Sequence, residues 1–190
     1  MPLPKQGTEY TYEDYLTWPE DERWEIIEGV PYMQAAPSSI HQEISMELST
    51  QIAAYLRGKL CKVYAAPFCV RFTKGIEMSN NQVKNVVEPD ISVICDRSKI
   101  DKQGCNGAPD MIIEILSPST ARADRFLKFN LYEKNGVTEY WLVDPEQKII
   151  SVHILQVNHK YGIQVFDEKA KIPVSIFEDL KIDIGTVFPV

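Results

Sequence analysis

Apolar residues recur every four positions between residues 41 and 57. This spacing places them on one face of an α-helix, which would bury that face against the rest of the protein. Ser38 or Ser39 can cap the first turn of this helix, and Gly58 can end it. The recurring residues are Ile44, Leu48, Ile52 and Leu56.

A second helix is predicted from residue 121 to residue 135. Ser119 or Thr120 can cap it, and Gly136 supplies the left-handed residue that commonly follows a helix. A shorter helical turn is predicted over residues 12–16, where Thr11 and Asp14 have capping-box spacing.

Short runs rich in β-branched and aromatic residues predict strands between these helices. Alternation on both sides of Glu28 and Gly29 indicates a tight hairpin with strands at residues 23–27 and 30–33. Further strands are predicted at residues 62–72 (with Pro67 at a bulge or edge), 86–94, 111–116, 139–144 and 149–155, followed by a hairpin after Tyr161. Residues 75–85 and 96–109 are rich in turn residues and predict loops.

The order of these elements predicts an α/β (α+β) fold, in which a mixed β-sheet is flanked by helices and extended by β-hairpins at both ends of the chain. A chain of 190 residues is long enough for one domain with a substantial core. We therefore expect a single domain over residues 1–190, with an N-terminal hairpin extension at 1–36, a core at 38–155 and C-terminal strands at 156–190.

The formal net charge of −7 argues against a protein that coats nucleic acid non-specifically, although an acidic metal site beside a basic groove would be compatible with it. No apolar run approaches the ~18 residues that cross a bilayer, so no membrane association is expected. The first residues lack the apolar core of a secretion signal, which favours a cytoplasmic location. The sequence motifs of P-loop hydrolases, Rossmann enzymes, serine esterases and zincins are absent.

The four cysteines show no C-x-x-C pair and no histidines at metal-binding spacing. In a cytoplasmic protein this pattern favours free thiols. We expect Cys69 and Cys95 to fill strand positions, with Cys61 and Cys105 also reduced.

Two carboxylates lie inside runs that otherwise predict buried strands. Asp90 follows Pro89 in VEPDISVICD, and Glu114 lies in PDMIIEIL. A buried acid needs a cation or a hydrogen-bond network, because it is costly to bury alone. Side chains alternate across a strand, so pairing of these strands would let Asp90 and Glu114 point the same way. Together with the backbone carbonyl of Ile115, they could hold Mg²⁺, for which Mn²⁺ can substitute.

A lysine on the second predicted helix can complete such a site. Lys128 shares a helix stripe with Leu131, which favours a position facing the sheet. Its ammonium could orient or deprotonate an attacking water. The alternative is a surface lysine paired with Asp124. Lys134 is the second candidate for the role.

Two further residues are candidate supporting groups. Glu25, on the first strand, could join the outer shell of the metal or be a solvated acid at a sheet edge. His41, at the start of the first long helix, could contact a phosphate or the attacking water, or make one structural hydrogen bond. Asp90 itself could merely cap the chain before its strand.

The amino-acid sequence resembles that of the Uma-type putative restriction endonuclease family of the PD-(D/E)xK nuclease superfamily. The phrases that carry the resemblance are RWEIIEG, APSSIHQEI, VEPDISVICD, GAPDMIIEILSPST, DRFLKFNLYEKNGVTEYWLVDP and FEDLKIDI, which span nearly the whole chain. The resemblance implies a restriction-endonuclease-like αβββαβ core that binds Mg²⁺. Leu116 occupies the superfamily's usual lysine position, and the Uma-type proteins resemble one another in placing that lysine on the next helix, here at Lys128.

These observations predict a Mg²⁺-dependent endonuclease acting on DNA, with catalytic Asp90, Glu114 and Lys128 supported by Glu25 and His41. Cutting both strands of a duplex requires two sites, so a homodimer is expected, with the C-terminal edge strands and the segment at residues 139–141 as candidate contacts. Two alternatives are a catalytically silent nucleic-acid-binding or regulatory module and an enzyme that hydrolyses RNA or a small phosphodiester.

Overall fold

The computed structural model describes residues 7–73, 78–117 and 123–189. Its centre is a mixed sheet in the order β12-β11-β10-β9-β6-β3, in which β9 and β10 run parallel and the other neighbours run antiparallel. The strands are β3 (Lys62–Ala65), β6 (Ile91–Ile94), β9 (Met111–Ile115), β10 (Glu139–Asp144), β11 (Ile149–Leu155) and β12 (Tyr161–Asp167).

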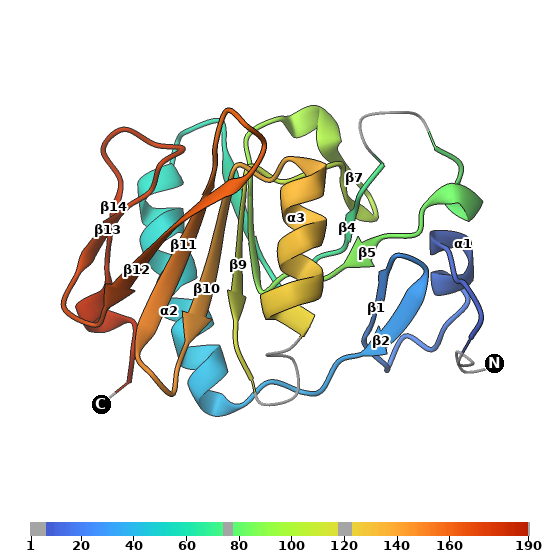
Figure 1. Cartoon of the computed structure of the whole chain (residues 1–190), viewed down its shortest axis with the longest axis horizontal. Coiled ribbons are helices and arrows are strands. Elements are labelled where there is room, and N and C mark those ends of the chain that lie inside the picture. Colours follow the sequence, from blue (N-terminus) through green and yellow to red (C-terminus); the bar gives the residue numbers. More distant parts are fainter. Residues whose placement is uncertain (1–6, 74–77, 118–122, 190) are drawn as a thin grey trace.

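Helices cover both faces of this sheet (Figure 1). On one face, α2 (Ser39–Leu56) buries its four-residue apolar repeat against β6, β9 and β10. On the other face, α3 (Phe129–Asn135) buries Leu131 and Tyr132. The order α2, β3, β6, β9, α3, β10 is the predicted αβββαβ core, so the predicted fold class is confirmed.

The start of α2 and the end of α3 lie at the predicted residues. Ser38 caps α2 by accepting a hydrogen bond from the backbone N–H of His41 at 3.2 Å. Gly136 ends α3 with φ of 79°, the left-handed value expected there. The segment just before α3, η3 (Ala123–Lys128), is a π-helix rather than the predicted α-helix. The predicted caps Ser119 and Thr120 and the predicted first residue Ala121 lie outside the described residues.

A second sheet contains the N-terminal hairpin and strands that the sequence did not separate. Its order is β2-β1-β5-β4-β8-β7 within the described residues. The predicted strand at 62–72 breaks at Pro67 and the one at 86–94 breaks at Pro89, because proline cannot donate a ladder hydrogen bond. The strands are β1 (Trp24–Ile27), β2 (Val30–Met33), β4 (Val70–Arg71), β5 (Val86–Val87), β7 (Ile100–Asp101) and β8 (Gly104–Asn106).

The remaining elements are short. The predicted loop at 96–109 contains β7 and β8, which are too short for a periodic signal. The predicted helical turn is α1 (Tyr12–Tyr15), the chain closes with β13 (Lys171–Pro173) paired to β14 (Lys181–Asp183), and 3₁₀ turns lie at Asn80–Gln82, Arg97–Lys99 and Ile184–Thr186. Within the described residues, no helix combines the length and apolarity needed to cross a bilayer.

Two of the four predicted free thiols are joined in a disulfide. Cys61 precedes β3 and Cys95 follows β6, and the antiparallel register of Lys62 with Ile94 continues outward to bring the two cysteines together. The prediction was wrong for this pair because the two residues are 34 positions apart and only the strand pairing makes them neighbours. Cys69 and Cys105 are free, as predicted.

Candidate active site

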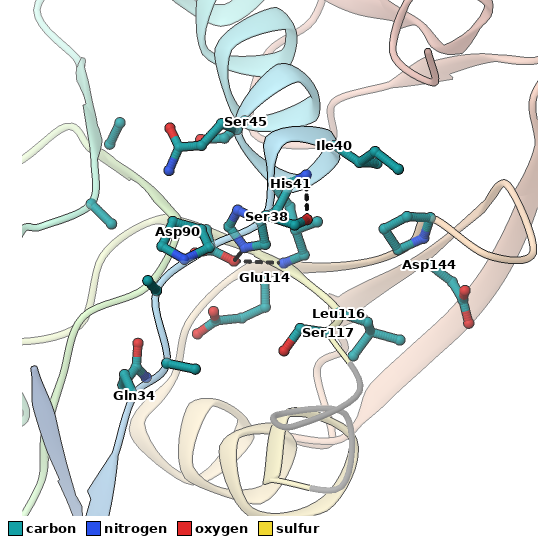
Figure 2. Close-up of a pocket in the computed structure, with 18 of the residues that line it drawn as sticks. Gln34, Ser38, Ile40, His41, Ser45, Asp90, Glu114, Leu116, Ser117 and Asp144 are labelled. Carbon is teal, nitrogen blue, oxygen red and sulfur yellow. Dashed lines mark hydrogen bonds and ion pairs between the residues drawn. The ribbon is translucent and has the colours of Figure 1, made fainter. Parts of the chain in front are cut away.

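The core strands bring the two predicted acids to one end of the sheet. Ile91 of β6 lies opposite Ile113 of β9, and continuing this antiparallel register by one residue places Asp90 opposite Glu114. Both acids line one cavity of about 810 Å³, together with Ile115 and Lys128 (Figure 2). The cavity lies between the start of α2, the ends of β9 and β10, and η3.

Asp90 is held by two donors on one oxygen. Its Oδ2 accepts a hydrogen bond from the backbone N–H of Ile115 at 2.8 Å and lies 3.0 Å from Nε2 of His41. Because a carboxylate accepts hydrogen bonds, Nε2 is the protonated nitrogen of this imidazole. Figure 2 shows the Asp90 carboxylate between the start of α2 and the chain that carries Glu114. Asp90 therefore links β6, β9 and α2 at the cavity.

Oε1 of Glu114 accepts hydrogen bonds from residues of η3 and α3, on the face of the sheet that α3 covers. This oxygen accepts from Lys128 Nζ at 3.0 Å and from the hydroxyl of Tyr132 at 2.6 Å. Burial is the main cause that raises the pKa of Tyr132 well above 10, followed by the charges of Glu114 and Glu25. The hydroxyl therefore remains a proton donor to this carboxylate at physiological pH.

Lys128 is a buried residue and not a surface lysine, while the side chain of Asp124, the alternative partner, lies outside the described part of the chain. Its side chain is 3% exposed, and its Nζ lies 2.9 Å from Oε1 of Glu25 as well as 3.0 Å from Glu114. The ammonium compensates charge on both buried carboxylates, which otherwise would be costly to desolvate. Lys134, the second candidate, is exposed and lies 3.2 Å from Glu28, away from the cavity lining.

Glu25 joins this cluster from the N-terminal hairpin. It is 2% exposed, which rules out the solvated alternative, and its Oε1 also accepts the backbone N–H of Glu88 at 2.8 Å. Glu88 in turn accepts from Nε of Arg23 at 3.0 Å. The hairpin thus supplies a buried acid to the lysine on η3.

Arginines at the cavity are ion-paired but retain exposed surface. Arg125 lies 2.7 Å from Asp144 and is 44% exposed, and Arg23, which pairs with Glu88, is 31% exposed. Both line the cavity and can reach an anion that enters it.

The donor set limits which metal the site could hold. Within the described residues, no group of three or more His, Cys, Asp and Glu side chains is arranged around one point. Zinc in proteins usually requires such a cage. Mg²⁺ usually takes one or two carboxylates and keeps several waters, so Asp90, Glu114 and the carbonyl of Ile115 fit that ion.

Of the five candidates named from the sequence, four line the cavity (His41, Asp90, Glu114 and Lys128) and Glu25 contacts Lys128. Tyr132 was not among them. The signal was present, because Tyr132 follows Lys128 by four residues and therefore shares its helix face. Tyr140 and Trp141 are fully buried in β10. Residues 139–141 therefore cannot provide the predicted dimer contact, because β10 lies between β9 and β11 in the sheet.

Comparison with known proteins identifies the family. The family model described as "Uma2: Putative restriction endonuclease" matches residues 12–185. The chain belongs to the Uma2 family. Its similarity to the "Uncharacterized protein slr1290" of Synechocystis sp. (strain ATCC 27184 / PCC 6803 / Kazusa) is 33% identity over 144 residues, which is 75% of this chain and 70% of that protein.

A solved structure has the same fold as this Uma2 protein. The crystal structure of a putative nuclease belonging to DUF820 from Anabaena variabilis ATCC 29413 superposes with a TM-score of 0.75 and 25% sequence identity. The match covers 94% of this chain and 97% of that one, so the fold of the Uma2 chain is that of a nuclease-like protein throughout.

Proposed function

We propose that this Uma2 protein is a Mg²⁺-dependent endonuclease that hydrolyses phosphodiester bonds of DNA. The observation that carries the proposal is the placement of Asp90 and Glu114 at one cavity with Lys128 in contact with Glu114. Membership of a family described as "Putative restriction endonuclease" and the nuclease-like fold support the proposal.

Each residue of the cluster has a separate task in this proposal. Asp90, Glu114 and the carbonyl of Ile115 would hold Mg²⁺, which when bound lowers the pKa of a coordinated water and offsets charge on the phosphate. Lys128 would orient or deprotonate the attacking water and balance phosphate charge. His41 would keep Asp90 oriented through its 3.0 Å contact, and Glu25 would hold Lys128 in place.

Cleavage of supercoiled plasmid DNA in millimolar MgCl₂ tests the proposal. We expect Asp90→Asn, Glu114→Gln and Lys128→Met each to lower the nicking rate at least about a hundredfold, because a catalytic metal supplies several kcal/mol of transition-state stabilisation. Lys134→Met and Asp96→Asn are matched controls, since both residues lie outside the cavity lining and should leave the rate unchanged. Chelation of the metal should stop the reaction.

The same assay distinguishes the alternatives. DNA binding without nicking by the wild type would identify a catalytically silent binding or regulatory module. Faster cleavage of RNA or of a small phosphodiester than of DNA would change the substrate class while retaining the site. Equal nicking rates in the wild type and Glu114→Gln would contradict the active-site assignment.

A homodimer through strand β12 is part of the proposed function, because a double-strand cut needs two sites. β12 is an edge strand of the central sheet, and it exposes Ile163 (59%) and Val165 (60%). An exposed apolar edge strand favours pairing with another chain. A second copy of β12 is the proposed partner.

A further inference from the structure

Tyr132 contacts the same oxygen of Glu114 as Lys128 does. The hydroxyl donates to Oε1 at 2.6 Å, and the ammonium lies 3.0 Å from that atom. We infer that Tyr132 is a positioning residue, which fixes the Glu114 carboxylate in the orientation that binds a divalent cation. The inference rests on the proposed function and adds a residue to its site.

The contact of the hydroxyl is separate from the packing of the ring. The Tyr132 ring packs against Phe72 at 5.9 Å and Tyr140 at 5.1 Å between ring centroids, within the apolar cluster beneath α3. Phenylalanine would retain these ring contacts. The hydroxyl therefore adds a directional hydrogen bond to Glu114 rather than the apolar packing of the helix.

This hydrogen bond restricts the last torsion of the Glu114 side chain. The last torsion of a glutamate is broad, so a carboxylate can turn unless hydrogen bonds fix it. Lys128 fixes it less firmly than a rigid donor would, because its flexible stem also places the ammonium 2.9 Å from Glu25. The tyrosine has a rigid ring on a helix that is packed against the sheet. Its donor therefore occupies one place.

An oriented carboxylate binds a cation more tightly because less ordering is required on binding. Removal of a group that orients a metal ligand typically weakens metal affinity by roughly 10–100-fold. Tyr132 contacts Glu114 and is fully buried, so it need not touch the cation to have this effect.

Manganese affinity of the full chain, measured by electron paramagnetic resonance, tests the inference. We expect Tyr132→Phe to raise the Mn²⁺ dissociation constant about tenfold at a temperature where circular dichroism shows the variant folded. Tyr161→Phe is the matched control. It also removes a hydroxyl from the α3 side of the sheet, but that hydroxyl donates to the carbonyl of Val137 at 2.8 Å, so its affinity should equal that of the wild type.

The outcomes separate this inference from the proposed function. Wild-type affinity in Tyr132→Phe, or equal weakening in both variants, would overturn the inference and leave the proposed function standing. No Mn²⁺ binding by the wild type would overturn both.

An infrared measurement covers the case in which Tyr132→Phe does not fold. Mn²⁺ binding should weaken Glu114 as an acceptor of the Tyr132 hydrogen bond. The infrared difference spectrum between the Mn²⁺-bound and Mn²⁺-free forms should therefore show a shifted tyrosine band, both in the wild type and in Tyr161→Phe. Absence of that band in a wild type that binds Mn²⁺ would overturn the inference.

Discussion

Nζ of Lys128 lies 2.9 Å from Oε1 of Glu25, and both side chains are 3% exposed. This ion pair ties the helix segment η3 to the N-terminal hairpin, which is far from it in sequence. It gives the hairpin a role in the site, because the lysine that contacts Glu114 is held by an acid from β1.

Replacement of Lys128 by methionine should lower the free energy of unfolding by about 3–5 kcal/mol, because it leaves buried carboxylates without their ammonium. The same change should tighten Mn²⁺ binding, since the cation then meets less positive charge. Urea unfolding and the rise in melting temperature on adding Mn²⁺ measure the two effects. Lys134→Met, at an exposed ion pair, should change stability by less than about 1 kcal/mol. Equal stability of both variants would contradict the account of the cluster.

Stability should fall in mild acid because of His153. Burial lowers the pKa of this imidazole below its usual 6.5, while its Nδ1 lies 3.0 Å from the carbonyl of Tyr140. As the pH falls through 6.5, the unfolded chain takes up a proton at this residue that the folded chain does not. The contribution of His153 to the free energy of unfolding is therefore fully present above that pH and is lost below it.

The measurement compares urea unfolding at pH 7.5 and pH 5.5, on either side of about 6.5. His153→Gln should lose less stability over this interval than the wild type does. His159→Gln, at an exposed residue, is the control. A wild-type pH dependence that persists unchanged in His153→Gln would assign the effect to other groups.

The disulfide between Cys61 and Cys95 should stabilise the oxidised protein. It closes a loop over a sequence separation of 34 residues, and loop-closure entropy predicts a contribution of roughly 3–4 kcal/mol. Dithiothreitol should lower the melting temperature of the wild type. It should have no effect on Cys61→Ala/Cys95→Ala, and a decrease of equal size in that variant would show that another feature responds to the reductant.

Charges on the β12 edge should prevent the proposed dimer. Ile163→Lys/Val165→Lys places two ammonium groups on the exposed strand, where like charges would repel across a two-fold contact. Analytical ultracentrifugation should give a monomer for this variant and a dimer for the wild type and for Val30→Lys, which alters the edge strand β2. The monomeric variant should nick plasmid DNA without making double-strand breaks. A monomeric wild type would refute the dimer.

Local patterns were sufficient for much of the fold. The four-residue repeat of α2, its cap at Ser38 and the left-handed Gly136 all follow from helix geometry, which acts over a few residues. The breaks at Pro67 and Pro89 could have been placed more firmly, since proline removes a ladder donor wherever it occurs. Asp90 and Glu114 could be predicted as site residues because they are acids within apolar runs, and a buried charge needs a partner.

Partners that lie far apart in the chain were decided by tertiary structure. Periodicity and charge are properties of single segments, so they were enough to predict the core elements and to nominate the acids and the lysine. Strand register brought Cys61 to Cys95, and the packing of β1 and α3 at the end of β9 brought Glu25 and Tyr132 to the lysine and Glu114. Such contacts depend on which segments pair and in which register, and a single segment does not encode its partner's position.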